Sequence, residues 1–177
     1  MAAATQTVPA LLTLEEYLGT SYHPDCDFVD GHIEERNMGE TKHGLLQVEV
    51  AFWFRSRKSE WNIRVITELR TRVGQTRVRI PDVTVAMNDE AMREQVRTTP
   101  PLIAIEVLSP EDRIPRVTQR LADFLAMGIP NIWILNPADR SASIFSDAGL
   151  EPVSGDRITV VDSPIYLDLA TVFSALD

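Results

Sequence analysis

Two almost entirely apolar runs, separated by one helical segment, constrain the fold most. The run 102–108 contains a single charged residue, Glu106, and the run 132–135 contains none. Such runs are typical of strands that are covered on both faces. Between them, residues 115–127 have apolar side chains at helical spacing and end before Gly128. A strand, a helix and a strand in this order predict parallel neighbours in a central sheet, and therefore an α/β or α+β fold.

Shorter signals lie on the N-terminal side of this unit. Thr13 followed by Glu16 is a capping-box pattern and predicts a short helix. Asp30-Gly31 stands between two apolar runs, which predicts a two-residue hairpin with strands near 26–29 and 32–37. Apolar residues at helical spacing then predict the first long helix over 42–58.

A second hairpin is expected over 63–86. Its strands are 63–73 and 76–86, joined at Gly74-Gln75 by a type II′ turn. This register places Thr67 opposite Asp82 and puts Glu68 on the other face of the ladder. Further short strands are expected near 143–145 and 158–161, with a closing helix over 167–176.

The composition fits one globular domain. The chain has 177 residues, of which 44% are hydrophobic and 24% are charged. We expect a flexible N-terminal segment over 1–12 and a single domain over 13–177. The one cysteine, Cys26, cannot form an internal disulfide, and no basic residue precedes the first apolar stretch, so a reducing cytoplasm is expected. The longest uncharged stretch, 124–138, is broken by glycine and prolines, so no membrane helix is expected.

Charge is distributed unevenly along the chain. The formal net charge is −9, which argues against a general polyanion binder. Residues 55–79 nevertheless contain eight basic and two acidic residues, a net charge of +6, which leaves −15 for the rest. An anionic ligand would be steered toward this basic segment, although arginines on the outer face of a hairpin also serve solubility and edge protection.

Two carboxylates lie in apolar stretches where hydrophobic core residues are expected. Asp82 follows Pro81 at the start of an apolar strand, and Glu106 interrupts the most apolar run of the chain. Buried carboxylates need a cation, hydrogen-bond donors or a proton, so the alternatives are a salt bridge to an arginine and a metal site. Carboxylates on neighbouring strands suit Mg²⁺ or Mn²⁺, with a backbone carbonyl such as that of Val107 completing the ligand set. The three histidines show no zinc-binding spacing.

A set of motifs resembles a known family. The motifs are Pro81-Asp82, then Ile-Glu-Val-Leu-Ser-Pro over 105–110, then Met-Gly-Ile-Pro over 127–130, and then Ile-Trp-Ile-Leu-Asn-Pro over 132–137. In this order and spacing, the chain resembles the bacterial restriction endonuclease family called Uma-two, of the PD-(D/E)XK nuclease superfamily. The resemblance implies a restriction-endonuclease-like fold, a mixed central sheet flanked by helices, and phosphodiester hydrolysis that depends on a divalent metal.

The resemblance also assigns catalytic roles. Asp82 and Glu106 match the two acids of the motif, but Leu108 stands where the usual lysine would be. Family members commonly carry the basic residue on the following helix, where this chain has Arg120. Arginine keeps its proton at neutral pH, so Arg120 would stabilise charge on the phosphate rather than act as a base. The alternative is that Arg120 lies along the helix edge and pairs with Asp123.

Additional acids and cations complete the expected site. Glu49 on the first long helix and Asp27 before the first hairpin are candidate metal ligands, whereas the register makes Glu68 a weaker one. His43 is expected either to contact a phosphate or to cap its helix. The arginines expected to contact DNA are Arg70, Arg72, Arg77 and Arg79.

Three functions remain open from the sequence. The first is a Mg²⁺-dependent endonuclease acting on DNA. The second is a nuclease-like domain that lost efficient chemistry and serves in nucleic-acid binding or protein interaction. The third is hydrolysis of a small phosphate compound. Superfamily nucleases often pair to cut two strands, so the resemblance also allows a homodimer.

Overall fold

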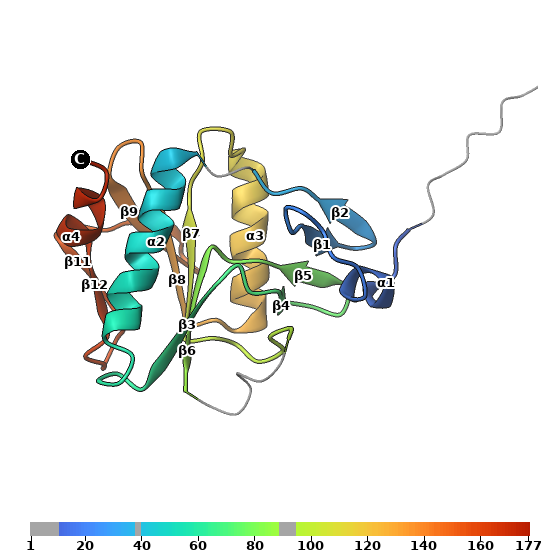
Figure 1. Cartoon of the computed structure of the whole chain (residues 1–177), viewed down its shortest axis with the longest axis horizontal. Coiled ribbons are helices and arrows are strands. Elements are labelled where there is room, and N and C mark those ends of the chain that lie inside the picture. The colour runs from blue at the N-terminus through green and yellow to red at the C-terminus, as the bar shows by residue number, and fades with distance from the viewer. Residues whose placement is uncertain (1–10, 38–39, 89–94) are drawn as a thin grey trace, which may run out of the picture.

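A six-stranded mixed sheet forms the centre of the computed structural model, which describes residues 11–37, 40–88 and 95–177 (Figure 1). The strand order is β10-β9-β8-β7-β6-β3, and only β7 and β8 run parallel. The predicted parallel pair and mixed central sheet are therefore confirmed. The strands are β3 (Ile63–Thr67), β6 (Val83–Met87), β7 (Ile103–Val107), β8 (Asn131–Asn136), β9 (Ser141–Ser146) and β10 (Gly149–Pro152).

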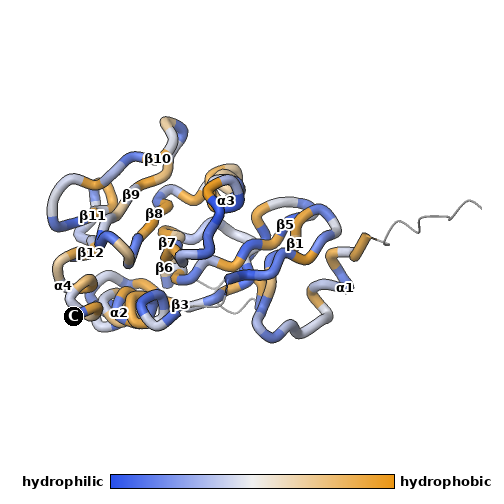
Figure 2. The backbone as a smooth tube through the Cα atoms, turned by 90° about the horizontal axis from the view of Figure 1, so that it is seen from above, coloured by the Kyte–Doolittle hydropathy of each residue, from blue (hydrophilic) through white to orange (hydrophobic). Residues whose placement is uncertain are grey.

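Helices cover both faces of this sheet (Figure 2). On one face, α2 (Thr41–Ser56) and α4 (Leu169–Ser174) pack against alternate residues of the strands, among them Ile105. On the other face, α3 (Ile114–Met127) packs against the intervening residues, which include Ala104. Because both faces are covered, β7 is buried along its whole length.

A smaller sheet lies beside α3 (Figure 1), with the order β2-β1-β5-β4. The Asp30-Gly31 hairpin is confirmed, and both residues have the positive φ that a two-residue turn of this kind needs. The N-terminal helix α1 (Leu14–Leu18) begins at the predicted capping box and packs on this sheet. The strands are β1 (Asp27–Val29), β2 (His32–Glu34), β4 (Thr71–Arg72) and β5 (Arg77–Arg79).

The long hairpin expected over 63–86 is divided between the two sheets. β3 pairs with β6 in the large sheet, and β4 pairs with β5 in the small one. The chain changes sheet at Glu68, whose φ is 54°, and the opposite strand is interrupted at Pro81, which has no N–H to continue a ladder. The expected register was wrong by one residue, because Thr67 pairs with Val83.

The turn of that hairpin also differs from the prediction. The Val73 N–H donates to the Arg77 carbonyl, which closes a three-residue loop. Gly74 does not have the positive φ that a type II′ turn requires at its first position.

The chain ends agree partly with the expectations. Residues 1–10 of the expected flexible segment 1–12 lie outside the described residues. Leu12, at the end of that segment, donates its N–H to the Gly31 carbonyl and so lies against the first hairpin. The expected closing helix is shorter because its first residues form β12 (Tyr166–Asp168), which pairs with β11 (Arg157–Thr159). Within the described ranges, no helix is long and apolar enough to cross a membrane.

Candidate active site

The two predicted acids lie side by side at one end of the central strands. Val83 of β6 pairs with Ile105 of β7, so the next positions along the ladder are Asp82 and Glu106. Both are almost fully buried, with 3% and 2% of their surface exposed. The Val107 N–H donates to Asp82 Oδ2 at 2.8 Å, which joins the two strands at this point.

Asp82 is surrounded by donors. Arg36 Nη2 donates to Asp82 Oδ1 at 2.6 Å, and His43 Nε2 lies 3.3 Å from Asp82 Oδ2. Burial opposes the charge of Asp82, but the hydrogen bond from His43 and the charge of Arg36 outweigh it and lower the pKa of this carboxyl group. Burial likewise opposes a charged imidazole, yet Asp82 raises the pKa of His43. Asp82 is therefore held as a carboxylate.

Glu106 has the opposite electrostatic character. Arg120 Nη1 donates to Glu106 Oε2 at 2.6 Å, whereas Glu106 Oε1 is buried without a hydrogen-bond partner. Burial raises the pKa of Glu106 to about 7, with the nearby Asp82 charge adding to the rise and Arg120 opposing it. The two acids thus share a site but differ in how firmly each holds its charge.

Arg120 joins the predicted acids to a third one. It pairs with Glu106, and its Nε lies 3.4 Å from Asp27 Oδ2. The alternative of a helix-edge pair with Asp123 is not what the structure shows. Asp27 is 1% exposed and accepts a hydrogen bond from the Ile80 N–H, and burial raises its pKa despite the charges of Arg120 and Arg79.

Glu49 does not join this cluster. It is half-buried on α2 and makes no hydrogen bond or ion pair with a described residue. Glu49 was a candidate because Leu45, Leu46, Phe52 and Trp53 surround it at helical spacing, which predicts that it points to the apolar side of the helix; that prediction was wrong, since Leu45 and Phe52 are 46% and 61% exposed. The buried side of α2 is formed by Leu46, Val50, Trp53 and Phe54.

The sequence reasoning placed Glu68 on the wrong face and did not identify Arg36. The Glu68 N–H donates to the Asp82 carbonyl, and Arg36 Nη1 lies 3.9 Å from Glu68 Oε1, so Glu68 is not on the opposite face as expected. Arg36 follows a three-residue strand, and no periodicity or motif marks it. Only the folded arrangement shows that it contacts Asp82.

Three of the four arginines expected to contact DNA are tied to carboxylates of the protein. Arg79 is 1% exposed. Arg77 pairs with Asp30 and Asp123. Arg70 pairs with Asp25 and lies over the ring of Tyr17. The carboxylates around Arg79 belong to Asp27, Glu34 and Asp123.

Two expected contacts with nucleic acid remain accessible to different degrees. Arg72 is exposed, and its guanidinium group donates to two backbone carbonyls of the adjacent loop. His43 lies in the first turn of α2 beside Asp82, and the helix N-cap is Glu40, so His43 is not the cap.

The donor set fits a hard divalent cation. Asp82 and Glu106 supply carboxylate oxygens, and the unpartnered Glu106 Oε1 is an orphaned buried acceptor of the kind that such an ion would satisfy. Within the described residues, no group of three or more His, Cys, Asp or Glu side chains is arranged as a complete metal cage. The fit is therefore to an open site, in which water and substrate supply the other ligands.

The fold and this buried acid pair define a restriction-endonuclease-like α+β protein. The chain belongs to the Uma-two family: a family model described as "Uma2: Putative restriction endonuclease" matches residues 12–168. The family expected from the motifs is confirmed.

One solved structure agrees with the fold over nearly the whole chain. It is described as a putative nuclease belonging to DUF820 from Anabaena variabilis ATCC 29413; it matches with a TM-score of 0.81 and 24% identity over 93% of this chain and 99% of that one. A cryoEM DrdV-DNA complex matches with a TM-score of 0.34 and 18% identity, over 74% of this chain and 85% of that one. No curated protein matches the chain.

Proposed function

We propose that this protein is a divalent-metal-dependent endonuclease that hydrolyses phosphodiester bonds of DNA, with Mg²⁺ or Mn²⁺ as the ion. The observation that carries the proposal is the pairing of Asp82 with Glu106, buried at adjacent strand positions, with Glu106 Oε1 unpartnered. Membership of a nuclease family supports the same reaction.

Under this proposal, the acidic residues would hold the metal ion and the arginine would contact the phosphate. Asp82 and Glu106 would hold the ion together with the Val107 carbonyl, and a bound divalent ion would lower the pKa of a water and withdraw charge from the phosphate. Arg120 would donate to the phosphate oxygens as negative charge builds on them. The carboxylate of Glu106 raises the pKa of Arg120 further above its usual range, so Arg120 cannot accept a proton.

The test is a metal titration with matched variants. Wild type, Asp82→Asn and Glu106→Gln are incubated with supercoiled and linear DNA over a range of Mn²⁺ and Mg²⁺ concentrations. We expect cleavage by the wild type only, with each variant at least 100-fold slower, and isothermal titration of Mn²⁺ should show weaker binding by both. Glu49→Gln serves as the control, because Glu49 lies outside the cluster, and it should cleave as the wild type does. No metal-dependent cleavage by the wild type on any DNA would contradict the proposal.

A second function is favoured because protein groups already contact both carboxylate oxygens of Asp82. Both of its carboxylate oxygens already have partners, namely Arg36, His43 and the Val107 N–H. A domain in which these ion pairs persist would bind nucleic acid or protein without cleaving it. In that case, the titration would give DNA binding that neither metal nor the Asp82→Asn change affects.

A further inference from the structure

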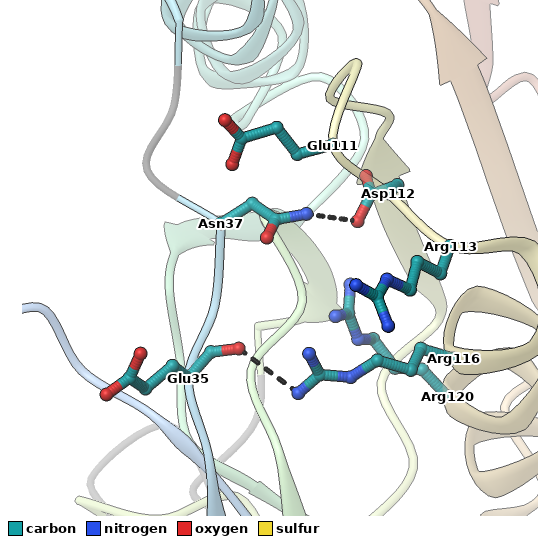
Figure 3. Close-up of a pocket in the computed structure, with 7 residues that line it drawn as sticks. All are labelled: Glu35, Asn37, Glu111, Asp112, Arg113, Arg116 and Arg120. Carbon is teal, nitrogen blue, oxygen red and sulfur yellow. Dashed lines mark hydrogen bonds between the residues drawn. The ribbon is translucent and has the colours of Figure 1, made fainter.

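A cleft of about 470 Å³ opens beside Arg120, between the segment that follows β2 and the start of α3 (Figure 3). It is adjacent to the acid pair, because Arg120 lines the cleft and also donates a hydrogen bond to Glu106. The lining residues are Glu35, Asn37, Glu111, Asp112, Arg113, Arg116 and Arg120.

Three arginines gather on one side of this cleft. Arg113 is the N-cap of α3, and Arg116 and Arg120 follow at helical spacing, so the three share a face of the helix. Figure 3 shows their guanidinium groups close together at the cleft. The positive end of the α3 dipole lies at the same place.

The two outer arginines are largely unneutralised. Arg113 is exposed and makes no ion pair within the described part of the chain. Arg116 is also exposed; it donates at 3.3 Å to the Glu35 carbonyl and lies 3.9 Å from the Glu34 carboxylate. By contrast, Arg70, Arg77 and Arg79 each have a carboxylate within 3.1 Å, so they have less charge to offer a ligand.

Among the described residues, the acids that line the cleft form no ion pair with these arginines. The carboxylates of Glu35 and Glu111 point away from the guanidinium groups (Figure 3). The Asp112 carboxylate keeps its charge, but it accepts its hydrogen bonds from Asn37 Nδ2 and the Ser109 N–H rather than from an arginine. The helix side of the cleft therefore presents guanidinium groups that are not held by the acids of the lining, with Arg120 at the end next to Glu106.

We propose that this cleft binds the backbone of a DNA strand next to the bond that is cleaved, with Arg113 and Arg116 contacting its phosphates. The inference rests on the proposed function, and it moves the DNA contact from the basic segment 55–79 to α3. Guanidinium groups bind phosphate oxygens through paired hydrogen bonds, which suits arginine better than lysine at such a surface. Arg120 would contact the scissile phosphate at the inner end.

The test measures DNA binding without metal. Fluorescence anisotropy with labelled duplex DNA in EDTA, over a salt series, is recorded for the wild type, Arg113→Ala/Arg116→Ala, and Arg55→Ala/Arg64→Ala. The control pair is exposed and lies on α2 and β3. We expect the α3 variant to bind at least tenfold more weakly and its salt dependence to fall by about one to two phosphate contacts. The control should stay within about threefold of wild type. Circular dichroism and thermal unfolding confirm that all three proteins fold.

The outcomes separate this inference from the nuclease proposal. Equal binding by the wild type and the α3 variant, an equal loss in the control pair, or no binding by the wild type at low salt would overturn the cleft as the DNA site. Cleavage with Mn²⁺ is measured on the same proteins. If none of them cleaves while the binding loss is confined to the α3 variant, the nuclease proposal fails and the cleft stands.

Discussion

At the scale of single residues, Arg120 is the cation that contacts Glu106 of the acid pair. Its guanidinium group reaches Glu106 at 2.6 Å and lies 3.4 Å from Asp27, so one cation serves two buried carboxylates from different sheets. The planar guanidinium group does this with two separate nitrogens, Nη1 toward Glu106 and Nε toward Asp27, whereas a lysine has one nitrogen. Under the proposed function, Arg120 would supply the charge of the missing motif lysine but not its proton chemistry.

Conservative and non-conservative substitutions of Arg120 should therefore slow DNA cleavage to different degrees. Arg120→Lys keeps a positive charge near Glu106 but cannot also reach Asp27, so we expect cleavage about tenfold slower than wild type. Arg120→Leu removes the charge and should be at least 100-fold slower. Single-turnover cleavage at saturating Mn²⁺ measures both. A leucine variant as fast as the wild type would show that Arg120 has no part in the reaction.

Residues that break a pattern could be found from the sequence, and those without a pattern could not. Glu106 stands out in an apolar run, and the structure places it beside Asp82 as expected. Arg79 was expected to contact DNA, but its side chain is buried and pairs with Asp123 of α3. Arg36 has no signal at all, since its role depends on a contact 46 residues away.

At the scale of elements, the predictions succeeded where periodicity is long. The helix α3 and the strands β7 and β8 lie within one or two residues of their expected bounds. The hairpin over 63–86 failed because an alternating pattern does not reveal which sheet a strand joins. A positive φ at Glu68 and the missing N–H of Pro81 split the ladder, and a one-residue change of register brought Glu68 next to Asp82.

The attachment of α1 to the small sheet depends on Tyr17 and predicts a pH dependence. Tyr17 is fully buried, and its hydroxyl group donates to the Cys26 carbonyl at 2.6 Å. Burial raises the pKa of Tyr17 above its ordinary value of about 10. The unfolded chain therefore loses this proton first, so the contribution is complete below pH 10 and falls as the pH rises above it.

The measurement is urea unfolding of wild type and Tyr17→Phe between pH 8 and pH 11. At pH 8, the variant should be less stable by about 1 kcal/mol, the usual net value of a buried hydrogen bond. Above pH 10 this difference should shrink, because Tyr17 of the unfolded wild type loses its proton there, whereas phenylalanine has no proton to lose. A difference that stays constant up to pH 11 would contradict the assignment.

At the scale of the whole molecule, the basic segment 55–79 is not one surface. Arg55 lies at the end of α2 that is remote from the cleft, whereas Arg70, Arg77 and Arg79 belong to the region of the small sheet and carry ion pairs. The ion pairs of these three arginines reduce the positive charge that the small-sheet part of the segment offers to an anionic ligand. This is consistent with weak nonspecific affinity that is sensitive to salt, and with α3 as the surface that DNA approaches.

A buried cation joins the strands of the small sheet to one another and to α3, and removing it should affect the stability of the whole molecule. Arg79 of β5 pairs with Asp27 of β1, Glu34 of β2 and Asp123 of α3. Arg79→Leu would leave these carboxylates without their shared cation, which in buried pairs costs about 3–5 kcal/mol. Arg79→Lys keeps the charge but has one nitrogen in place of the separate Nε and Nη1 that contact these carboxylates, so its loss of stability should be intermediate.

Urea unfolding followed by tryptophan fluorescence and circular dichroism measures this loss. Arg72→Ala is the matched control, because Arg72 is an exposed arginine of β4. It should change the free energy of unfolding by less than about 0.5 kcal/mol. If Arg79 instead acted mainly by contacting DNA, Arg79→Leu would unfold within about 1 kcal/mol of wild type and lose DNA affinity. We expect the reverse order, with the free energy of unfolding strongly reduced and the DNA affinity of the folded fraction unchanged, because an arginine that is 1% exposed has no surface to present to a phosphate.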